Sequence, residues 1–195
     1  MTTTKKPDET PLLTCATQAE WRQWLKKNHA GSKGVWLVLA KKGAPEPTVT
    51  YAEALEVALC WGWIDGQKGA IDAHAWKQRF TPRGPKSIWS QINRDKVAQL
   101  IESGEMQPPG QAQVDAAKAD GRWEAAYASP SKAEVPEALT KALAKNAKAK
   151  AFFATLKSAN RYAVLFRIHH TKTPETRAKK IAAIVEMLAR GETFH

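Results

Sequence analysis

The sequence has no long hydrophobic run and very little cysteine. Its 195 residues contain no stretch of about 18 consecutive apolar residues, which argues against a membrane-spanning helix. Residues 1–17 include Lys5 and Lys6 but lack the apolar segment of a secretory signal. The two cysteines, Cys15 and Cys60, form one disulfide at most, and this number indicates no disulfide framework. We therefore predict a polar leader over residues 1–17 and a cytoplasmic protein.

Motifs for cofactors and metals are also missing. The chain has neither a Walker loop nor the glycine fingerprint of dinucleotide-binding proteins. His169 and His170 are adjacent and diverge on a helix, and no histidine pair has the i, i+4 spacing of a metal site. No glycine-framed nucleophile supports a Ser-His-Asp triad. We expect no metal and no cofactor, and whether the protein is an enzyme stays open.

Acidic residues are almost absent from residues 141–180. This segment has eleven lysines and arginines and one acid, Glu175, and so carries nearly all of the formal net charge of +11. Such a charge density favours anionic partners, although lysines spaced three and four apart are also typical of a solvated helix face. We favour the second interpretation for the lysines of 141–150. All eight tryptophans precede residue 129, so they do not interleave with the basic run, and nucleic acid is a possible but not a favoured partner.

Two capping boxes and several apolar runs predict the elements of the first part of the chain. In each box a threonine is followed three residues later by a glutamate, at residues 17–20 and 50–53, and each pair predicts a helix start. The first helix is expected to end near Asn28. Alternating or β-branched apolar residues predict strands over 35–39, within 61–66 and over 72–80, with a turn at 68–71.

The remainder of the chain has helical periodicity. Helices are predicted over 87–103, 109–119 and 173–190, with further helix starts at Pro136 and Ser158. The composition changes near residue 130. We predict an α+β fold: a helix-rich domain with a small, antiparallel sheet over residues 18–129, followed by a small all-helical basic domain over residues 130–195.

The first candidate site is the segment 60–67. Trp61 and Trp63 flank a glycine and precede Asp65 and Gln67, a pattern that combines flat apolar surfaces, backbone freedom and one carboxylate. Asp65 is a candidate general acid or base. In the alternative interpretation, which we favour for the tryptophans alone, both are core residues and Asp65 caps a turn.

The second candidate site follows the strand over 72–80 and reaches the start of a helix. Arg79 and Arg83 can each bind a carboxylate or phosphate through two hydrogen bonds, and the free amides at a helix start favour anions. The other candidate binding residues of this segment are Lys86, Ser87, Trp89 and Asn93. Alternatively, a serine caps the helix and the arginines pair with acids such as Asp65 or Asp72, and we give these two interpretations equal weight.

A third group, Asn160 and Arg161, opens a helix in the C-terminal part. We combine the three groups into one hypothesis, a cleft lined by tryptophan, aspartate and arginine that binds a small or anionic ligand. The competing hypotheses are a nucleic-acid-binding module that uses the basic helices and a protein-interaction module without a small ligand. The oligomeric state stays undetermined.

These motifs resemble the YdeI/OmpD-associated family, a bacterial group of bacteriocin-protection proteins. The resemblance is carried by residues 60–66, 78–83, 85–87, 89–90, 158–162 and 174–178, and it extends from about Trp21 to His195. The family's C-terminal module resembles the helical part from about Glu134 onward. The resemblance implies a soluble bacterial protein with a role in stress or in tolerance to bacteriocins and cationic antimicrobial peptides, partly through an outer-membrane porin. It supplies no catalytic residues.

Overall fold

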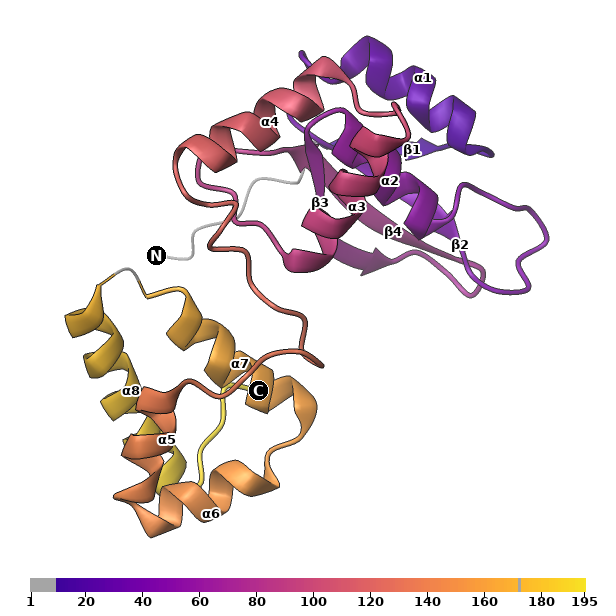
Figure 1. The fold of residues 1–195 in the computed structure, drawn as a ribbon. Coiled ribbons are helices and arrows are strands. Elements are labelled where there is room, and N and C mark those ends of the chain that lie inside the picture. Colours follow the sequence, from indigo (N-terminus) through magenta and orange to yellow (C-terminus); the bar gives the residue numbers. More distant parts are fainter. Residues whose placement is uncertain (1–9, 172) are drawn as a thin grey trace, which may run out of the picture. The chain divides into compact units, whose positions relative to one another are not determined.

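The computed structural model describes residues 10–171 and 173–195, which form two compact units. Residues 10–89 and 93–125 make up the first, called the sheet unit below, and residues 90–92 and 126–195 make up the second, called the helical unit. Figure 1 shows the elements of both units in chain order. The α+β class with a helical C-terminal part is confirmed. No helix of the described residues is both long and apolar enough to cross a membrane.

A four-stranded mixed sheet forms the centre of the sheet unit. Its strands are β1 (Leu12–Thr14), β2 (Val35–Ala40), β3 (Trp63–Ala70) and β4 (Ala75–Pro82), in the spatial order β1-β2-β4-β3. The pairs β2–β4 and β3–β4 are antiparallel, as predicted. The prediction of an antiparallel sheet was incomplete, because β1 pairs with β2 in parallel.

Strand β1 lies inside the segment predicted as a polar leader. The Trp36 amide donates to the Pro11 carbonyl oxygen at 2.8 Å, and the Val49 amide donates to the Cys15 carbonyl oxygen at 3.0 Å. Cys15 is buried. Three residues are too few to show alternation, so no pattern in the sequence indicated this strand. The rest of the predicted leader, residues 1–9, lies outside the described residues.

The hairpin between β3 and β4 turns later than the sequence suggested. Residues 68–70, part of the predicted turn, extend β3, and the turn lies at residues 71–74. The Asp72 carboxylate accepts hydrogen bonds from the amides of His74 and Ala75, at 2.7 and 2.8 Å. These bonds lower the pKa of Asp72. An aspartate that accepts hydrogen bonds from the amides two and three residues ahead stabilises a turn. The turn therefore forms after Asp72 and not at Gly69, which lies in β3.

Four helices belong mainly to the sheet unit: α1 (Gln18–Asn28), α2 (Tyr51–Cys60), α3 (Gln91–Glu102) and α4 (Pro108–Ala119). Both predicted capping interactions form. Thr17 accepts from the Glu20 amide at 3.2 Å, and Thr50 and Glu53 complete a reciprocal capping box. Helix α3 begins four residues after the predicted start at residue 87 and ends close to the predicted end.

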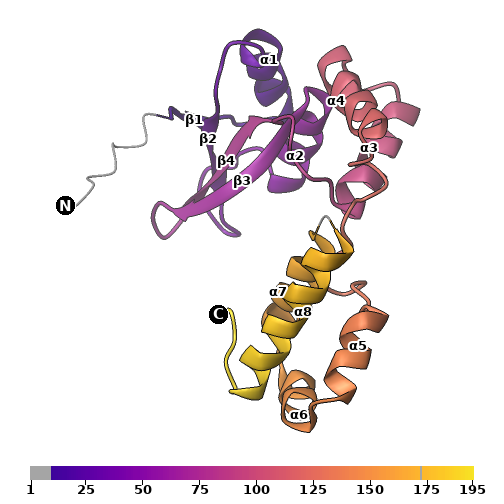
Figure 2. The ribbon, with the colours of Figure 1, turned by 90° about the vertical axis from the view of Figure 1, so that its left-hand side faces the viewer.

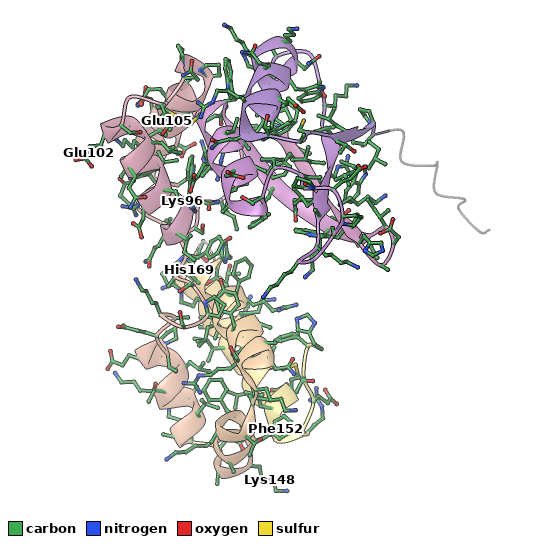
Figure 3. All side chains as sticks on the ribbon, turned by 90° about the vertical axis from the view of Figure 1, so that its right-hand side faces the viewer. Lys96, Glu102, Glu105, Lys148, Phe152 and His169 are labelled. Atoms are coloured by element: carbon green, nitrogen blue, oxygen red, sulfur yellow. The ribbon has the colours of Figure 1, made fainter. Side chains whose placement is uncertain are left out.

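Helices α1 and α2 cover one face of the sheet (Figure 2). Phe80 of β4 lies on this face, with its ring centroid 5.5 Å from that of Trp21 of α1. The buried Trp21 indole nitrogen donates to the Ala54 carbonyl oxygen of α2 at 3.0 Å. Lys96 of α3, labelled in Figure 3, forms an ion pair with Glu56 of α2 at 2.7 Å. The core of this unit combines buried aromatic side chains with aliphatic ones such as Leu25 and Leu37, and it lies between the sheet and the helices.

The helical unit consists of α5 (Glu137–Ala144), α6 (Ala147–Thr155), α7 (Ser158–His169) and α8 (Pro174–Ala189). Helix α8 contacts each of the other three. Its apolar residues Ile181, Ile184 and Leu188 recur at helical spacing, and all three are buried. They pack with Leu139 of α5 and other aliphatic side chains into a core of their own.

Candidate functional site

The two tryptophans of the first candidate site have structural contacts. Trp63 is 1% exposed, and its indole nitrogen donates to the His29 carbonyl oxygen at 3.2 Å. Trp61 is half-buried, with its ring centroid 4.7 Å from that of His29. The buried indole nitrogen of Trp61 has no hydrogen-bond partner in the described part of the chain. Trp63 is therefore a core residue, whereas Trp61 is only half-buried.

The glycine between the tryptophans serves helix packing. Gly62 has a φ of +73°, which favours glycine, and a Cβ atom there would lie 2.8 Å from the Pro109 carbonyl oxygen of α4. A Cβ atom on Gly110 would collide with the Cys60 carbonyl oxygen of α2. Two glycines thus allow the end of α2 and the start of α4 to approach closely, which accounts for the backbone freedom noted at position 62.

Asp65 and Arg79, which we predicted to share a cleft, project from opposite faces of the sheet. Asp65 pairs directly with Phe80, so its side chain lies on the helix-covered face, where the Tyr51 hydroxyl donates to it at 2.8 Å. Arg79 precedes Phe80 on β4 and therefore projects from the other face. There its guanidinium donates to Thr10 at 3.1 Å and lies 5.9 Å from the Trp36 ring. Alternation along one strand separates the carboxylate from this arginine.

The second candidate site does bring an arginine and a tryptophan together. The guanidinium carbon of Arg83 lies 3.6 Å from the centroid of Trp89, and its Nη1 donates to the Ile88 carbonyl oxygen at 3.2 Å. Trp89 in turn contacts Trp123, with ring centroids 4.9 Å apart, and Arg94 lies 5.1 Å from the Trp123 ring. Arg83 and Trp89 are only 5% and 2% exposed. The two indoles thus lie between two arginines in the sheet unit, with Arg83 and Trp89 buried and Arg94 and Trp123 half-buried.

The remaining predicted residues are dispersed. Gln67 and Lys86 are exposed, and Asn93 is half-buried. Ser87 closes a turn, accepting from the Gly84 amide at 2.9 Å. In the helical unit, Asn160 exchanges two hydrogen bonds with His195, and Arg161 lies 4.7 Å from the Phe153 ring. Ligand binding by these residues stays a prediction.

Neither cysteine is exposed. Burial raises the pKa of both Cys15 and Cys60 to about 11. Both thiols are free and buried, so they are protonated and unreactive near neutral pH. Among residues 10–171 and 173–195, no three His, Cys, Asp or Glu side chains are grouped in a way that could hold a metal ion.

A cavity of about 910 Å³ lies in the helical unit, and none of the candidate residues named above is among the residues that line it. Tyr127, Tyr162 and Phe166 supply aromatic walls, and Leu165 and Ile168 supply aliphatic ones. The rings of Tyr127 and Phe166 meet edge-on at 5.2 Å, and those of Tyr162 and Phe166 lie 5.7 Å apart. The Tyr162 hydroxyl donates to the Ala128 carbonyl oxygen at 3.1 Å, and burial raises its pKa. These contacts fix the aromatic walls.

Polar and charged side chains also line this cavity. His169 and Arg177 line it together with Lys132 and Glu134. Figure 3 labels His169 at the end of α7, whereas Phe152 and Lys148 lie on α6 at the opposite end of the helical unit. The cavity therefore combines a fixed aromatic wall with charged groups at its edge.

Sequence reasoning missed this cavity, although part of its signal was present. Tyr162, Phe166 and His169 recur at the helical spacing i, i+4, i+7, which places them on one face of α7. Tyr127 precedes them by 35 residues in an irregular segment, where the Gln91 amide donates to its carbonyl oxygen at 2.9 Å. Only the tertiary fold brings this segment to α7.

The matches to known families follow the division into two units. The chain belongs to the family described as domain of unknown function (DUF8412), whose model matches residues 13–113. Residues 132–191 match the family described as "Bacteriocin-protection, YdeI or OmpD-Associated". This second match confirms the resemblance noted above for the C-terminal part, over fewer residues than the predicted range from Trp21 to His195. No curated protein and no solved structure matches the chain.

Proposed function

We propose that this protein binds a small organic ligand in the cavity of the helical unit. The single observation that carries the proposal is the cavity of about 910 Å³ with its three aromatic side chains. Ligand sites in proteins are typically clefts of roughly 300–1,000 Å³ with apolar walls and few polar groups. We therefore keep the hypothesis of a small-molecule ligand, but we propose a binding site in the helical unit instead of the sheet unit.

The aromatic walls favour a ligand with a flat apolar body. Tyr127, Tyr162 and Phe166 are held by one another and by the Tyr162 hydrogen bond, so they lose little conformational entropy when a ligand enters. Offset or edge contacts between rings add to the burial of apolar area. An aromatic or alicyclic ring system is therefore the ligand class that we propose.

We further propose a role in stress or bacteriocin tolerance, in which the protein sequesters or senses its ligand in the cytoplasm. The match of residues 132–191 to the bacteriocin-protection family supports this role, and the cavity lies largely within that range. The two free cysteines are in keeping with a reducing compartment.

The test uses 1-naphthylmethanol, a neutral bicyclic probe. Titration of the ¹⁵N-labelled protein should shift the backbone amides of Tyr127, Phe166 and His169 in a saturable way, with a stoichiometry of one. Absence of saturable shifts, or shifts confined to the sheet unit, would overturn the proposal.

Two variants give a matched control for this titration. Ala133 lines the cavity, and Ala133→Trp should fill part of it and abolish the shifts. Ala154 is an exposed alanine of α6 that does not line the cavity, and Ala154→Trp should bind the probe like the parent protein. Far-UV circular dichroism checks that both variants fold, and Tyr162→Leu, which removes one aromatic wall, replaces Ala133→Trp if that variant does not fold.

Nucleic-acid binding by the basic helices is a second candidate function. The helical unit has thirteen lysines and arginines against five acids. Among its described residues, only Lys141 and Arg190 form ion pairs, with Glu137 and Glu192. The unneutralised charge favours anionic partners, although the solvated helix surface that we predicted for these lysines explains it equally well.

A further inference from the structure

Arg177 stands out among the polar groups of the cavity because its guanidinium is fixed but not neutralised. Its Nε donates to the Thr171 hydroxyl at 3.1 Å, and its Nη2 lies 3.5 Å from the Thr171 carbonyl oxygen. No carboxylate pairs with it in the described part of the chain. Arg177 is exposed and lines the aromatic cavity, so its guanidinium is accessible to an anionic ligand there.

A buried residue holds this guanidinium in place. Thr171 is 8% exposed, and its hydroxyl donates to the Ile168 carbonyl oxygen of α7 at 2.6 Å. The hydroxyl then accepts from Arg177, so a short chain of hydrogen bonds ties the side chain of an α8 residue to the end of α7. The Nη1 group takes no part in this chain. Because the guanidinium is already oriented, little conformational entropy is lost when it binds a ligand.

The other formal charges of the cavity cancel. Lys132 and Glu134 are two residues apart, both are exposed, and both line the cavity. Their charges are opposite, so Arg177 leaves the cavity with a net positive charge even when His169 is neutral. A guanidinium binds carboxylates and phosphates through charge-assisted hydrogen bonds, whereas it repels cations.

We propose that the ligand of this cavity is an amphipathic anion, an aromatic or alicyclic carboxylate or a compound of equivalent charge, whose anionic group binds Arg177. This inference rests on the proposed function, because it names the chemical class of the ligand for the same cavity. The ring system lies against Tyr127, Tyr162 and Phe166, and the anionic group lies at the end of α7 where Thr171 holds the guanidinium.

The experiment compares three probes with the same ring system: 1-naphthoate, 1-naphthylmethanol and 1-naphthylmethylammonium. Dissociation constants come from the same NMR titration at constant ionic strength. The anion should bind about tenfold more tightly than the neutral probe, because hydrogen bonds to charged groups are stronger than neutral ones. The cation should bind most weakly.

Substitutions then assign the preference to one side chain. Arg177→Met should remove the advantage of the anion over the neutral probe, and Arg177→Lys should keep part of it. Lys179, an exposed residue of the same helix, does not line the cavity. Lys179→Met removes the same charge and should leave the ratio unchanged.

The outcomes separate this inference from the proposed function. If the anion and the neutral probe bind equally well, the inference is wrong and the proposed function stands. If no probe binds, both are wrong. Equal losses in Arg177→Met and Lys179→Met would overturn the assignment to Arg177, because they would mean that overall charge alone sets the preference.

Discussion

The two units use aromatic and basic residues in opposite ways. In the sheet unit Trp21, Trp63 and Trp89 are almost completely buried beside aliphatic residues, and Arg83 lies 3.6 Å from the Trp89 ring. In the helical unit the interior is mainly aliphatic, and Tyr127, Tyr162 and Phe166 line a cavity. Residue type alone thus does not distinguish a core from a site. The difference is whether the aromatic rings pack fully against other side chains or line a cavity.

The two units also differ in net charge, and the helical unit is the more positive of the two. The sheet unit has fifteen lysines and arginines and twelve acids among residues 10–89 and 93–125, whereas the helical unit has thirteen and five. In the sheet unit the Lys96–Glu56 ion pair connects α3 with α2, and the Arg22–Glu105 ion pair connects α1 with the segment between α3 and α4. The excess charge of the helical unit has few such partners, which leaves it available for ligands or for solvent.

Separate cores predict separate unfolding, and this is the largest effect we expect. Trp63→Ala should lower the unfolding free energy of the sheet unit by about 3–5 kcal/mol, because it removes a fully buried indole. Ile184→Ala should lower that of the helical unit by about 2–5 kcal/mol. All eight tryptophans precede residue 124, so tryptophan fluorescence reports on the sheet unit, while far-UV circular dichroism reports on both.

In denaturant titrations, Trp63→Ala should move the transition seen by fluorescence to lower denaturant concentration. Ile184→Ala should leave that transition unchanged. It should move only the unfolding of the helical unit, which circular dichroism detects and tryptophan fluorescence does not. If either substitution moved both transitions together, the two units would unfold as one. The predicted division at residue 130 would then have no thermodynamic meaning.

A smaller difference between the units should appear at alkaline pH. Both cysteines lie in the sheet unit, and burial raises the pKa of each thiol to about 11, above the value of about 8.5 expected in an unfolded chain. Below pH 8.5 the thiols are protonated in both states and stability is unaffected. As pH rises from there through about 11, the unfolded thiols ionise first, so the unfolding free energy of the sheet unit falls.

Denaturant titrations followed by tryptophan fluorescence at several pH values measure this fall. The double variant Cys15→Ala, Cys60→Ala should show a shallower pH dependence than the parent protein, since only the thiol contribution is removed. An unchanged slope would contradict the burial of the thiols.

The smallest effect that we expect concerns nucleic acid. If the basic helices are a solvated surface, the protein should bind single-stranded DNA weakly, and fluorescence anisotropy should give no saturable binding at physiological salt. Tight binding that weakens steeply with salt would instead support the second candidate function, because phosphate contacts release counterions. Lys148→Glu on α6 should then weaken DNA binding without changing the binding of 1-naphthoate.

Local signals in the sequence predicted much of the fold. The threonine–glutamate pairs at residues 17–20 and 50–53 predicted two helix starts, and the apolar run at 35–39 predicted β2. The parallel strand β1 could not be predicted, because its partner lies more than twenty residues away and its own three residues carry no periodicity. The candidate site was harder. Asp65 and Arg79 were grouped because they are close in sequence, and the alternation of β4 places them on opposite faces of the sheet.

By itself, the sequence determined the α+β class, the change to a helical C-terminal part, the concentration of positive charge there and the family resemblance of that part. These properties depend on composition, local periodicity and short motifs, which are readable without long-range contacts. Only the tertiary structure decided which aromatic residues are core and which line a cavity, and it alone brought Tyr127 to Phe166 and fixed Arg177 on Thr171. The Tyr127–Phe166 contact joins segments that are 39 residues apart, and the Arg177–Thr171 contact depends on how α8 packs against the end of α7.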